Sequence, residues 1–287
     1  MHEATITSLF RYPVKSARGL AVNRSVVLRT GLAGDRQWLI VDGTGNFVTQ
    51  RQKAELATIA VTEVEFGLVL TCRDQSLELH SDRIKARAVT REVTVWNDRV
   101  AAFDAGDDAA AFLAETIGEN RGRPLRLVLV KEHRTKLIRN APSQDLNGQT
   151  VPIAFTDGYP FLITTVASLT ELQQRIERNH PGEGSAITSR RFRPNIVLDA
   201  VAAHAEDQID FIETRSGLRI RLVKPCARCV IPMGDPETGV RGPEPMRTLR
   251  AYRSQKNGIM FGQNAILTAG EGETISVGDK VRIEYRS

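Results

Sequence analysis

Short stretches with the residue pattern of β-strands recur along most of this 287-residue chain, separated by turns rich in Gly and Asp. The pattern fills most of the first hundred residues and returns after residue 257. Many short strands are typical of a barrel or a sandwich. We therefore expect a β-rich α+β fold with a few flanking helices. The expected strands are Ala4–Phe10, Ser25–Leu28, Gln37–Val41, Thr58–Val64, Gly67–Thr71, Glu92–Val95, Leu125–Val130, Tyr159–Thr165, Ile196–Leu198, Gly217–Val223, Ile259–Phe261, Ala265–Thr268, Thr274–Ser276 and Lys280–Glu284.

Two segments carry helix signals. A short helix is predicted from Asp107, with an acidic first turn and Gly118 as its stop. A clearer helix is predicted to begin at Ser168, which forms a capping box with Glu171 and follows a predicted strand. The free N–H groups of its first turn, with the hydroxyls at the end of that strand, can seat an anion. Ordinary capping without a ligand is the alternative.

Two of the three cysteines, Cys226 and Cys229, lie in a Cys-x-x-Cys motif with Lys224 before them and Arg228 between them. Nearby cations favour the thiolate, which is the nucleophilic and metal-ligating form. The alternating run before the motif predicts a strand, and the turn signals after it place both thiols on a loop leaving that strand.

Several chemistries are open to this motif. A zinc site needs further ligands, but the remaining cysteine is Cys72 and the histidines are not paired. A thioredoxin-type redox pair begins a helix, which the prolines at 232 and 236 prevent here. What remains is a single thiolate ligand or nucleophile supported by cations, or two inert buried cysteines.

The net charge of +5 is concentrated in three clusters of Lys and Arg: residues 121–139, residues 190–193 and residues 219–228. Such clusters are either solvated faces or a pocket for an anion, because the arginine fork binds phosphate oxygens in pairs. Nucleic acid is not expected, because no aromatic residue interleaves the first cluster and no recognition motif is present.

The location of the protein can also be predicted. No apolar run has the length of a signal peptide or of a membrane span. Three cysteines do not suggest a disulfide framework, so a reducing compartment is expected. We expect a cytoplasmic protein.

Several motifs, in this order and spacing, resemble those of the MOSC family (molybdenum cofactor sulfurase C-terminal domain) with its N-terminal β-barrel module. The similarity is greatest to the mitochondrial amidoxime-reducing component and to bacterial N-hydroxylaminopurine-reducing relatives, and it covers nearly the whole chain. The motifs are Tyr12-Pro-Val-Lys-Ser16, Gly34-Asp-Arg36, the stretch Asp157–Ser168, Arg193-Pro-Asn195, Lys224-Pro-Cys226, Asp235-Pro-Glu-Thr-Gly239, Phe261-Gly262 and Val277-Gly-Asp279.

The resemblance implies an N-terminal barrel-like domain over residues 1–120 and a MOSC barrel over residues 121–287, closing over one cofactor pocket. It implies that Cys226 is the protein thiolate on molybdenum, held by the pterin of the molybdenum cofactor (molybdopterin), a role that suits a soft anionic sulfur. Asp235 is implied as a nearby acid that delivers protons or fixes the cysteine loop. The residues implied to hold the cofactor are Lys15, Ser16, Arg36, Thr164, Thr165, Ser168, Arg193, Asn195 and Lys224, together with Cys226.

The implied activity is that of a molybdenum-dependent oxidoreductase that reduces small N-hydroxylated or N-oxygenated substrates. Because the chain ends at Ser287 without cysteines for an iron–sulfur cluster, we expect electrons from a separate redox protein: ferredoxin-like, a flavin reductase or cytochrome b5-like. Gln263 and Asn264 stand where related reductases often carry a tyrosine, which leaves the substrate open.

Two other functions fit the same motif. Cys226 could carry a persulfide in a sulfur transferase, or the protein could be a non-enzymatic carrier of the cofactor. Cys229 either supports the cysteine loop or takes part in sulfur transfer or redox protection.

Overall fold

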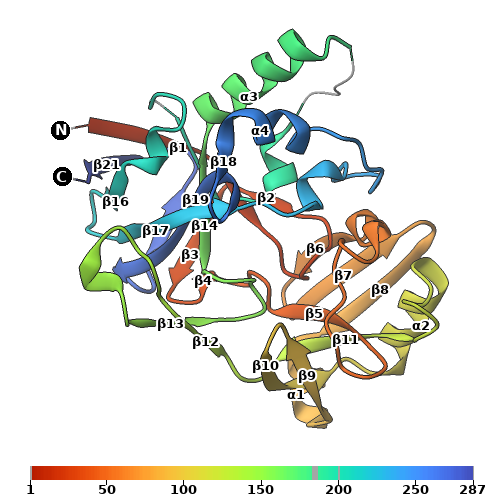
Figure 1. Cartoon of the computed structure of the whole chain (residues 1–287). Coiled ribbons are helices and arrows are strands. Elements are labelled where there is room, and N and C mark those ends of the chain that lie inside the picture. Colours follow the sequence, from red (N-terminus) through yellow and green to blue (C-terminus); the bar gives the residue numbers. More distant parts are fainter. Residues whose placement is uncertain (1, 183–186, 200, 287) are drawn as a thin grey trace.

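The computed structural model describes residues 2–182, 187–199 and 201–286. Its centre is a closed β-barrel, in which β19 pairs with β17 on one side and with β14 on the other. The β-rich fold predicted from the sequence is confirmed (Figure 1). In order around the barrel the seven strands are β14 (Phe161–Thr165), β15 (Ile196–Asp199), β1 (His2–Arg11), β21 (Lys280–Tyr285), β16 (Ile209–Thr214), β17 (Arg219–Ala227) and β19 (Gly258–Ala269).

The barrel closes because each strand turns one apolar face inward. On β17, Ile220 and Leu222 are buried in the core, while Arg219 and Arg221, which alternate with them, face outward. Gly262 lies where β19 approaches β14, with φ at +74°, and a Cβ there would lie 2.8 Å from the Ile163 carbonyl oxygen. The glycine of the Phe-Gly motif therefore permits the pairing that closes the barrel.

The N-terminal module wraps a second apolar core, formed by a four-stranded sheet, a three-stranded sheet and two short helices. The four-stranded sheet has the order β5-β11-β10-β9, and the other sheet has the order β6-β7-β8. These elements are β5 (Trp38–Asp42), β6 (Ala60–Val64), β7 (Gly67–Cys72), β8 (Gln75–His80), α1 (Ser81–Arg87), β9 (Thr90–Val95), β10 (Asp98–Asp104), α2 (Asp107–Thr116) and β11 (Leu125–Val130).

The chain passes between the two modules more than once. The first strand, β1, belongs to the C-terminal barrel, whereas β11 belongs to the N-terminal sheet although it follows residue 120. The division at residue 120 stays a prediction. The smaller strands are β2 (Leu20–Val22), β3 (Arg24–Leu28), β4 (Gly31–Leu32), β12 (Arg134–Leu137), β13 (Thr150–Ile153), β18 (Ser254–Gln255) and β20 (Thr274–Ser276).

Two helices cover one end of the barrel, α3 (Val166–Asn179) and α4 (Met246–Arg253). The predicted start of the first was wrong. Its N-cap is Thr165, whose hydroxyl accepts a hydrogen bond from the Ser168 backbone N–H, so the helix begins two residues earlier than the capping box indicated. The Thr165 hydroxyl caps the helix and also binds the buried Glu206, which the Ser168 hydroxyl binds beside it. Within the described residues, no helix is long and apolar enough to cross a membrane.

Candidate functional site

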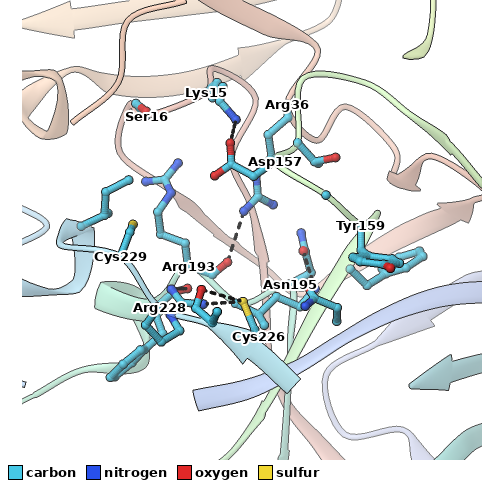
Figure 2. A pocket seen from close by; sticks show the side chains of 18 of the residues that line it. Lys15, Ser16, Arg36, Asp157, Tyr159, Arg193, Asn195, Cys226, Arg228 and Cys229 are labelled. Atoms are coloured by element: carbon cyan, nitrogen blue, oxygen red, sulfur yellow. Dashed lines mark hydrogen bonds and ion pairs between the residues drawn. The ribbon is translucent and has the colours of Figure 1, made fainter. Parts of the chain in front are cut away.

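The candidate site is a pocket between the end of the barrel and the N-terminal module (Figure 2). The segment after β1 forms one side of it, and the residues just before β15 and at the end of β17 form the other. It is lined by Lys15, Ser16, Arg36, Thr49, Thr156, Asp157, Gly158, Tyr159, Phe161, Leu162, Phe192, Arg193, Asn195, Cys226, Ala227, Arg228, Cys229, Ile231 and Asn264.

Cys226 presents its sulfur to this pocket from the C-terminal end of β17. Irregular pairing between β17 and β19 around positions 224–227 leaves the thiol half-buried at the barrel end. One guanidinium nitrogen of Arg228 lies 3.1 Å from Sγ, and the other donates to the Phe192 carbonyl oxygen at 2.7 Å. The predicted cation beside the thiol is therefore present. Cys226 lies within the strand, not on the loop as expected, and Cys229 follows on the loop and lines the same pocket.

Two arginines, one from each module, meet in the pocket. The guanidinium carbons of Arg36 and Arg193 each lie 4.2 Å from the centre of the buried Tyr12 ring. Arg36 forms an ion pair with the buried Asp35 at 2.5 Å and donates to the Arg193 carbonyl oxygen at 3.2 Å.

The hydrogen bonds of the Arg193 guanidinium are less complete. One of its nitrogens donates to the Ala17 carbonyl oxygen at 2.8 Å, but Nη2 is buried without a hydrogen-bond partner among the described residues. Burial, and then the charge of Arg36, lower the pKa of Arg193 to about 10. Arg36 forms the ion pair with Asp35, whereas Arg193 forms no ion pair among the described residues, and an anionic ligand would satisfy its free nitrogen.

Three pocket residues adopt left-handed backbone conformations without being glycine. The φ angles are +70° at Ser16, +47° at Arg36 and +57° at Arg193. Such conformations are uncommon for these residue types and tend to persist where function requires them. No turn-forming residue at these positions signals the conformation in the sequence.

Lys15 and Asp157 form an ion pair across the pocket. The Lys15 Nζ donates to Asp157 at 2.6 Å and to the Phe155 carbonyl oxygen at 2.7 Å. Burial lowers the pKa of Lys15, and the Asp157 charge opposes this. Burial alone would raise the pKa of Asp157, but the charge and hydrogen bond of Lys15 hold it well below its usual range. Lys15 thus reaches the pocket already paired.

The exposed Trp96, between β9 and β10, extends this ion pair. Its Nε1 donates to Asp157 at 3.1 Å, and Arg51 stacks on the indole at 4.5 Å. Sequence reasoning missed both residues, and it did not assign a role to Asp157 although the residue begins a motif. The chain offers no local signal for Trp96, because a hairpin far from that motif brings it there.

Four predicted cofactor residues do not line the pocket: Thr164, Thr165, Ser168 and Lys224. Thr165 and Ser168 are buried and bind the carboxylate of the buried Glu206 through their hydroxyls, at 3.1 Å and 2.8 Å. Thr164 is buried in β14, with a hydroxyl that has no hydrogen-bond partner in the described parts of the chain. The hydroxyls at this helix N-terminus therefore serve an internal cluster, and the alternative of capping without a ligand describes them.

The remaining predicted residues have other partners. The Asn195 side chain lines the pocket, but its amide bridges the Phe10 carbonyl oxygen and the Leu162 N–H. Asp235 lies outside the pocket lining and accepts hydrogen bonds from the backbone of Glu237 and Thr238. Burial would raise the pKa of Asp235, but those bonds lower it, so this carboxylate fixes a turn in ionised form. Lys224 lies at the rim, 5.4 Å from the ring of Tyr159.

Several cations of the basic clusters are neutralised by ion pairs. In the first, Arg123, Arg126 and Arg134 pair with aspartates of the N-terminal module. Of the residues in these clusters, Arg193 and Arg228 line the pocket, and the other cations of its lining, Lys15 and Arg36, lie outside the clusters. Within the described ranges, no group of three or more His, Cys, Asp or Glu side chains could hold a metal ion.

Two family models match the chain. Residues 3–120 match the MOSC N-terminal beta barrel domain, and residues 150–282 match the MOSC domain. Mitochondrial amidoxime-reducing component 1 of Homo sapiens is 31% identical over 96% of this chain and 82% of its own length. Mitochondrial amidoxime reducing component 2 of Homo sapiens is 30% identical over 87% of this chain and 72% of its own length. The molybdenum cofactor sulfurase of Homo sapiens is 26% identical over 96% of this chain but only 32% of its own length. The chain belongs to the MOSC proteins with an N-terminal MOSC β-barrel domain, the family of the mitochondrial amidoxime-reducing components.

Proposed function

We propose that this protein is a molybdenum-cofactor oxidoreductase that reduces small N-hydroxylated substrates. The observation that carries the proposal is one pocket that holds both a half-buried thiol, Cys226, and the incompletely satisfied guanidinium of Arg193. A molybdenum pterin needs these two features together, because its metal takes a soft sulfur ligand and its phosphate takes cationic donors.

The residues present fit such a group. Arg36 and Arg193 would hold the phosphate, with Ser16 beside them, and Cys226 would be the protein ligand of the metal. The third donor of Lys15 is available beside its two hydrogen bonds. Once bound, the cofactor supplies the two-electron redox chemistry, and the protein positions and tunes it.

The side chains around Cys226 have separate tasks. Arg228 orients the thiol and places positive charge against it, since its guanidinium is fixed by the Phe192 carbonyl oxygen. Asp235 holds the turn after the cysteine loop, and its ion pair with Arg191 at 3.5 Å joins that turn to the segment before Arg193. Among the roles considered for Asp235, fixing the loop is the one that these contacts support.

The reaction requires an outside source of electrons. Removing the hydroxyl oxygen of an N-hydroxylated substrate as water breaks the N–O bond and consumes two electrons and two protons. We propose that a separate redox protein (ferredoxin-like, a flavin reductase or cytochrome b5-like) supplies the electrons to the pocket. The human relatives are named amidoxime-reducing components, which is consistent with a reaction that several proteins carry out together.

Sulfur transfer is the second candidate, favoured by the similarity to the molybdenum cofactor sulfurase and by a second pocket thiol, Cys229. In this function Cys226 would carry a persulfide, and no metal would be needed.

Metal analysis and turnover distinguish the two candidates. The protein is produced in a cofactor-competent host as wild type, as Cys226→Ala and, as a matched control, as Cys229→Ala. The reductase is supported if molybdenum and pterin copurify with wild type and with Cys229→Ala, and if both proteins reduce an amidoxime with a chemical electron donor. Cys226→Ala should then lack the metal, the pterin and the activity. Sulfane sulfur on Cys226 in metal-free protein overturns it in favour of the transferase.

A further inference from the structure

The pocket opens to solvent where Asp157 lies. Among the described residues that line the pocket, Asp157 and Ala227 are the exposed ones, and 52% of the Asp157 side chain is accessible. Lys15, which donates to the same carboxylate, is only 7% accessible (Figure 2). Asp157 and Ala227 therefore mark the mouth of the pocket, where a ligand enters.

Trp96 lies at this mouth. Its Nε1 donates to Asp157 Oδ1 at 3.1 Å, the same oxygen that accepts from Lys15. The two neighbours of the indole also contact the lining. The centre of the Phe47 ring lies 5.9 Å from Lys15 Nζ, and an Arg51 nitrogen lies 3.9 Å from Asp157 Oδ1. Contacts with two lining residues thus place this aromatic group beside the opening.

The backbone around Trp96 holds the indole in this position. Trp96 begins the turn between β9 and β10 with φ at +59°, which is uncommon for so bulky a side chain. The loop that carries Phe47 is bonded to β9, because the Phe47 N–H donates to the Thr94 carbonyl oxygen at 3.1 Å. Gly45 permits this approach, since a Cβ there would lie 2.6 Å from the Glu92 carbonyl oxygen. Strained residues that a second segment holds in place are concentrated at functional sites.

Part of the indole stays open although its surroundings are packed. The Arg51 guanidinium carbon lies 4.5 Å from the centre of the ring, and the Phe47 ring lies 5.2 Å from it. Trp96 is nevertheless 46% exposed, whereas Trp38, the other tryptophan, is 3% exposed. The part of the indole that the protein leaves uncovered can stack with a flat ligand.

The charges around the indole favour one kind of ligand. Arg51 and Lys15 carry two positive charges, and Asp157 balances one of them. The remaining charge disfavours a second cation on the ring. Ring stacking in turn favours a planar group over a puckered aliphatic one.

We propose that Trp96 is a specificity residue at the mouth of the pocket, on which an aromatic or heteroaromatic ring of the substrate stacks while its N-hydroxyl group enters toward Cys226. This inference rests on the proposed function, because it names the class of substrate for that reaction. An aliphatic N-hydroxylated compound lacks the stacking and is the poorer substrate.

Two neutral amidoximes of similar size test the proposal. Benzamidoxime has a planar ring and cyclohexanecarboxamidoxime a puckered one, and both carry the same reacting group. Reduction by a chemical electron donor gives the ratio of their kcat/KM values. This ratio does not depend on the fraction of the protein that is folded or loaded with cofactor.

Trp96→Leu is expected to lower the ratio of benzamidoxime to its analogue about tenfold, because it removes a stacking surface. Trp96→Phe restores a ring and should keep the ratio within about threefold of wild type. Phe66→Leu removes an aromatic side chain that is 57% exposed at the turn between β6 and β7, outside the pocket lining. It is the matched control and should leave the ratio unchanged.

Fluorescence gives a readout that needs no turnover. In the oxidised holoenzyme without an electron donor, benzamidoxime should quench the emission of Trp96 saturably, and the cyclohexyl analogue should not. The quenching should disappear in Trp96→Phe, in which the buried Trp38 is the remaining tryptophan.

The outcomes separate this inference from the proposed function. If neither compound is reduced while quenching that depends on Trp96 persists, the proposed reaction fails and the ring site stands. If both are reduced and Trp96→Leu has the same ratio as Phe66→Leu, the ring site fails alone. A loss in Trp96→Leu that is equal for both compounds, and that occurs only with a protein electron donor, would make Trp96 a docking residue for that donor and overturn the inference.

Discussion

Two polar centres lie at opposite ends of β14, and they are built in opposite ways. In the pocket, Arg36 pairs with Asp35, while Arg193 keeps a buried nitrogen without a partner among the described residues. In the cluster at the start of α3, the Glu206 carboxylate receives the hydroxyls of Ser168 and Thr165.

The difference separates binding from structure. A closed cluster satisfies its own hydrogen bonds and stabilises the start of the helix. A cluster with unpaired charged groups is instead stabilised when it binds a ligand of opposite charge. Both centres draw on motifs of the same family resemblance, yet only the pocket combines unsatisfied cations with Cys226.

Removing a hydroxyl from the cluster around Glu206 is expected to have the largest effect on stability. Ser168→Ala deletes a donor to the buried Glu206 carboxyl group and the acceptor of the part-buried His204 backbone N–H, which lies at 2.8 Å. We expect the free energy of unfolding to fall by about 3 kcal/mol. Urea denaturation measures the change, with exposed Ser254→Ala as control. A loss no greater than that of the control would mean that the cluster is not structural.

Removing a charge from the pocket should leave the free energy of unfolding almost unchanged. Arg193→Met removes an incompletely paired buried charge, so the unfolding free energy of cofactor-free protein should change by less than about 1 kcal/mol. Inorganic phosphate, as a probe anion, should raise the Tm of wild type but not of this variant. Arg219→Met, which breaks a surface pair with Glu213, is the control and should keep the phosphate effect. Phosphate stabilisation that survives in Arg193→Met would place the anion elsewhere.

The buried carboxyl group of the cluster should set part of the pH dependence of stability. Burial raises the pKa of Glu206 above its usual value, against the hydrogen bonds from Ser168 and Thr165. Its folded-state pKa therefore exceeds the unfolded one, so its contribution is fully present below the unfolded pKa and is lost as pH rises through the folded pKa. Glu206→Gln should flatten this decline in urea unfolding measured from about pH 4 to pH 8. An unchanged slope would contradict the assignment.

The smallest effect is expected at the exposed edge of the pocket. Trp96→Phe keeps an aromatic ring under Arg51 but removes the N–H donated to Asp157. Because the indole is half exposed, we expect a change in unfolding free energy within about 0.5 kcal/mol. Thermal denaturation beside wild type measures it. A loss several times larger would make this residue part of the fold rather than of the pocket wall.

Alternation and turn residues are local signals, and they predicted six of the seven barrel strands, although β19 was divided into two. The barrel strand β16 (Ile209–Thr214) was missed. The prediction of the site was uneven for a physical reason. Lys15, Arg36 and Cys226 sit in short motifs whose backbone carries them into the pocket. The destination of the Ser168 hydroxyl depends instead on Glu206, which is remote in sequence, and no local pattern encodes that contact. Trp96 was missed for the same reason.

The central claim is that the pocket, and not the cluster, holds the molybdenum cofactor. The most direct test is the molybdenum content per folded chain of Arg193→Met and Ser168→Ala, each purified beside wild type from a cofactor-competent host. We predict wild-type molybdenum content in Ser168→Ala and a loss of at least about tenfold in Arg193→Met, because the phosphate loses a charged donor. Full molybdenum in Arg193→Met together with its loss from folded Ser168→Ala would contradict the account.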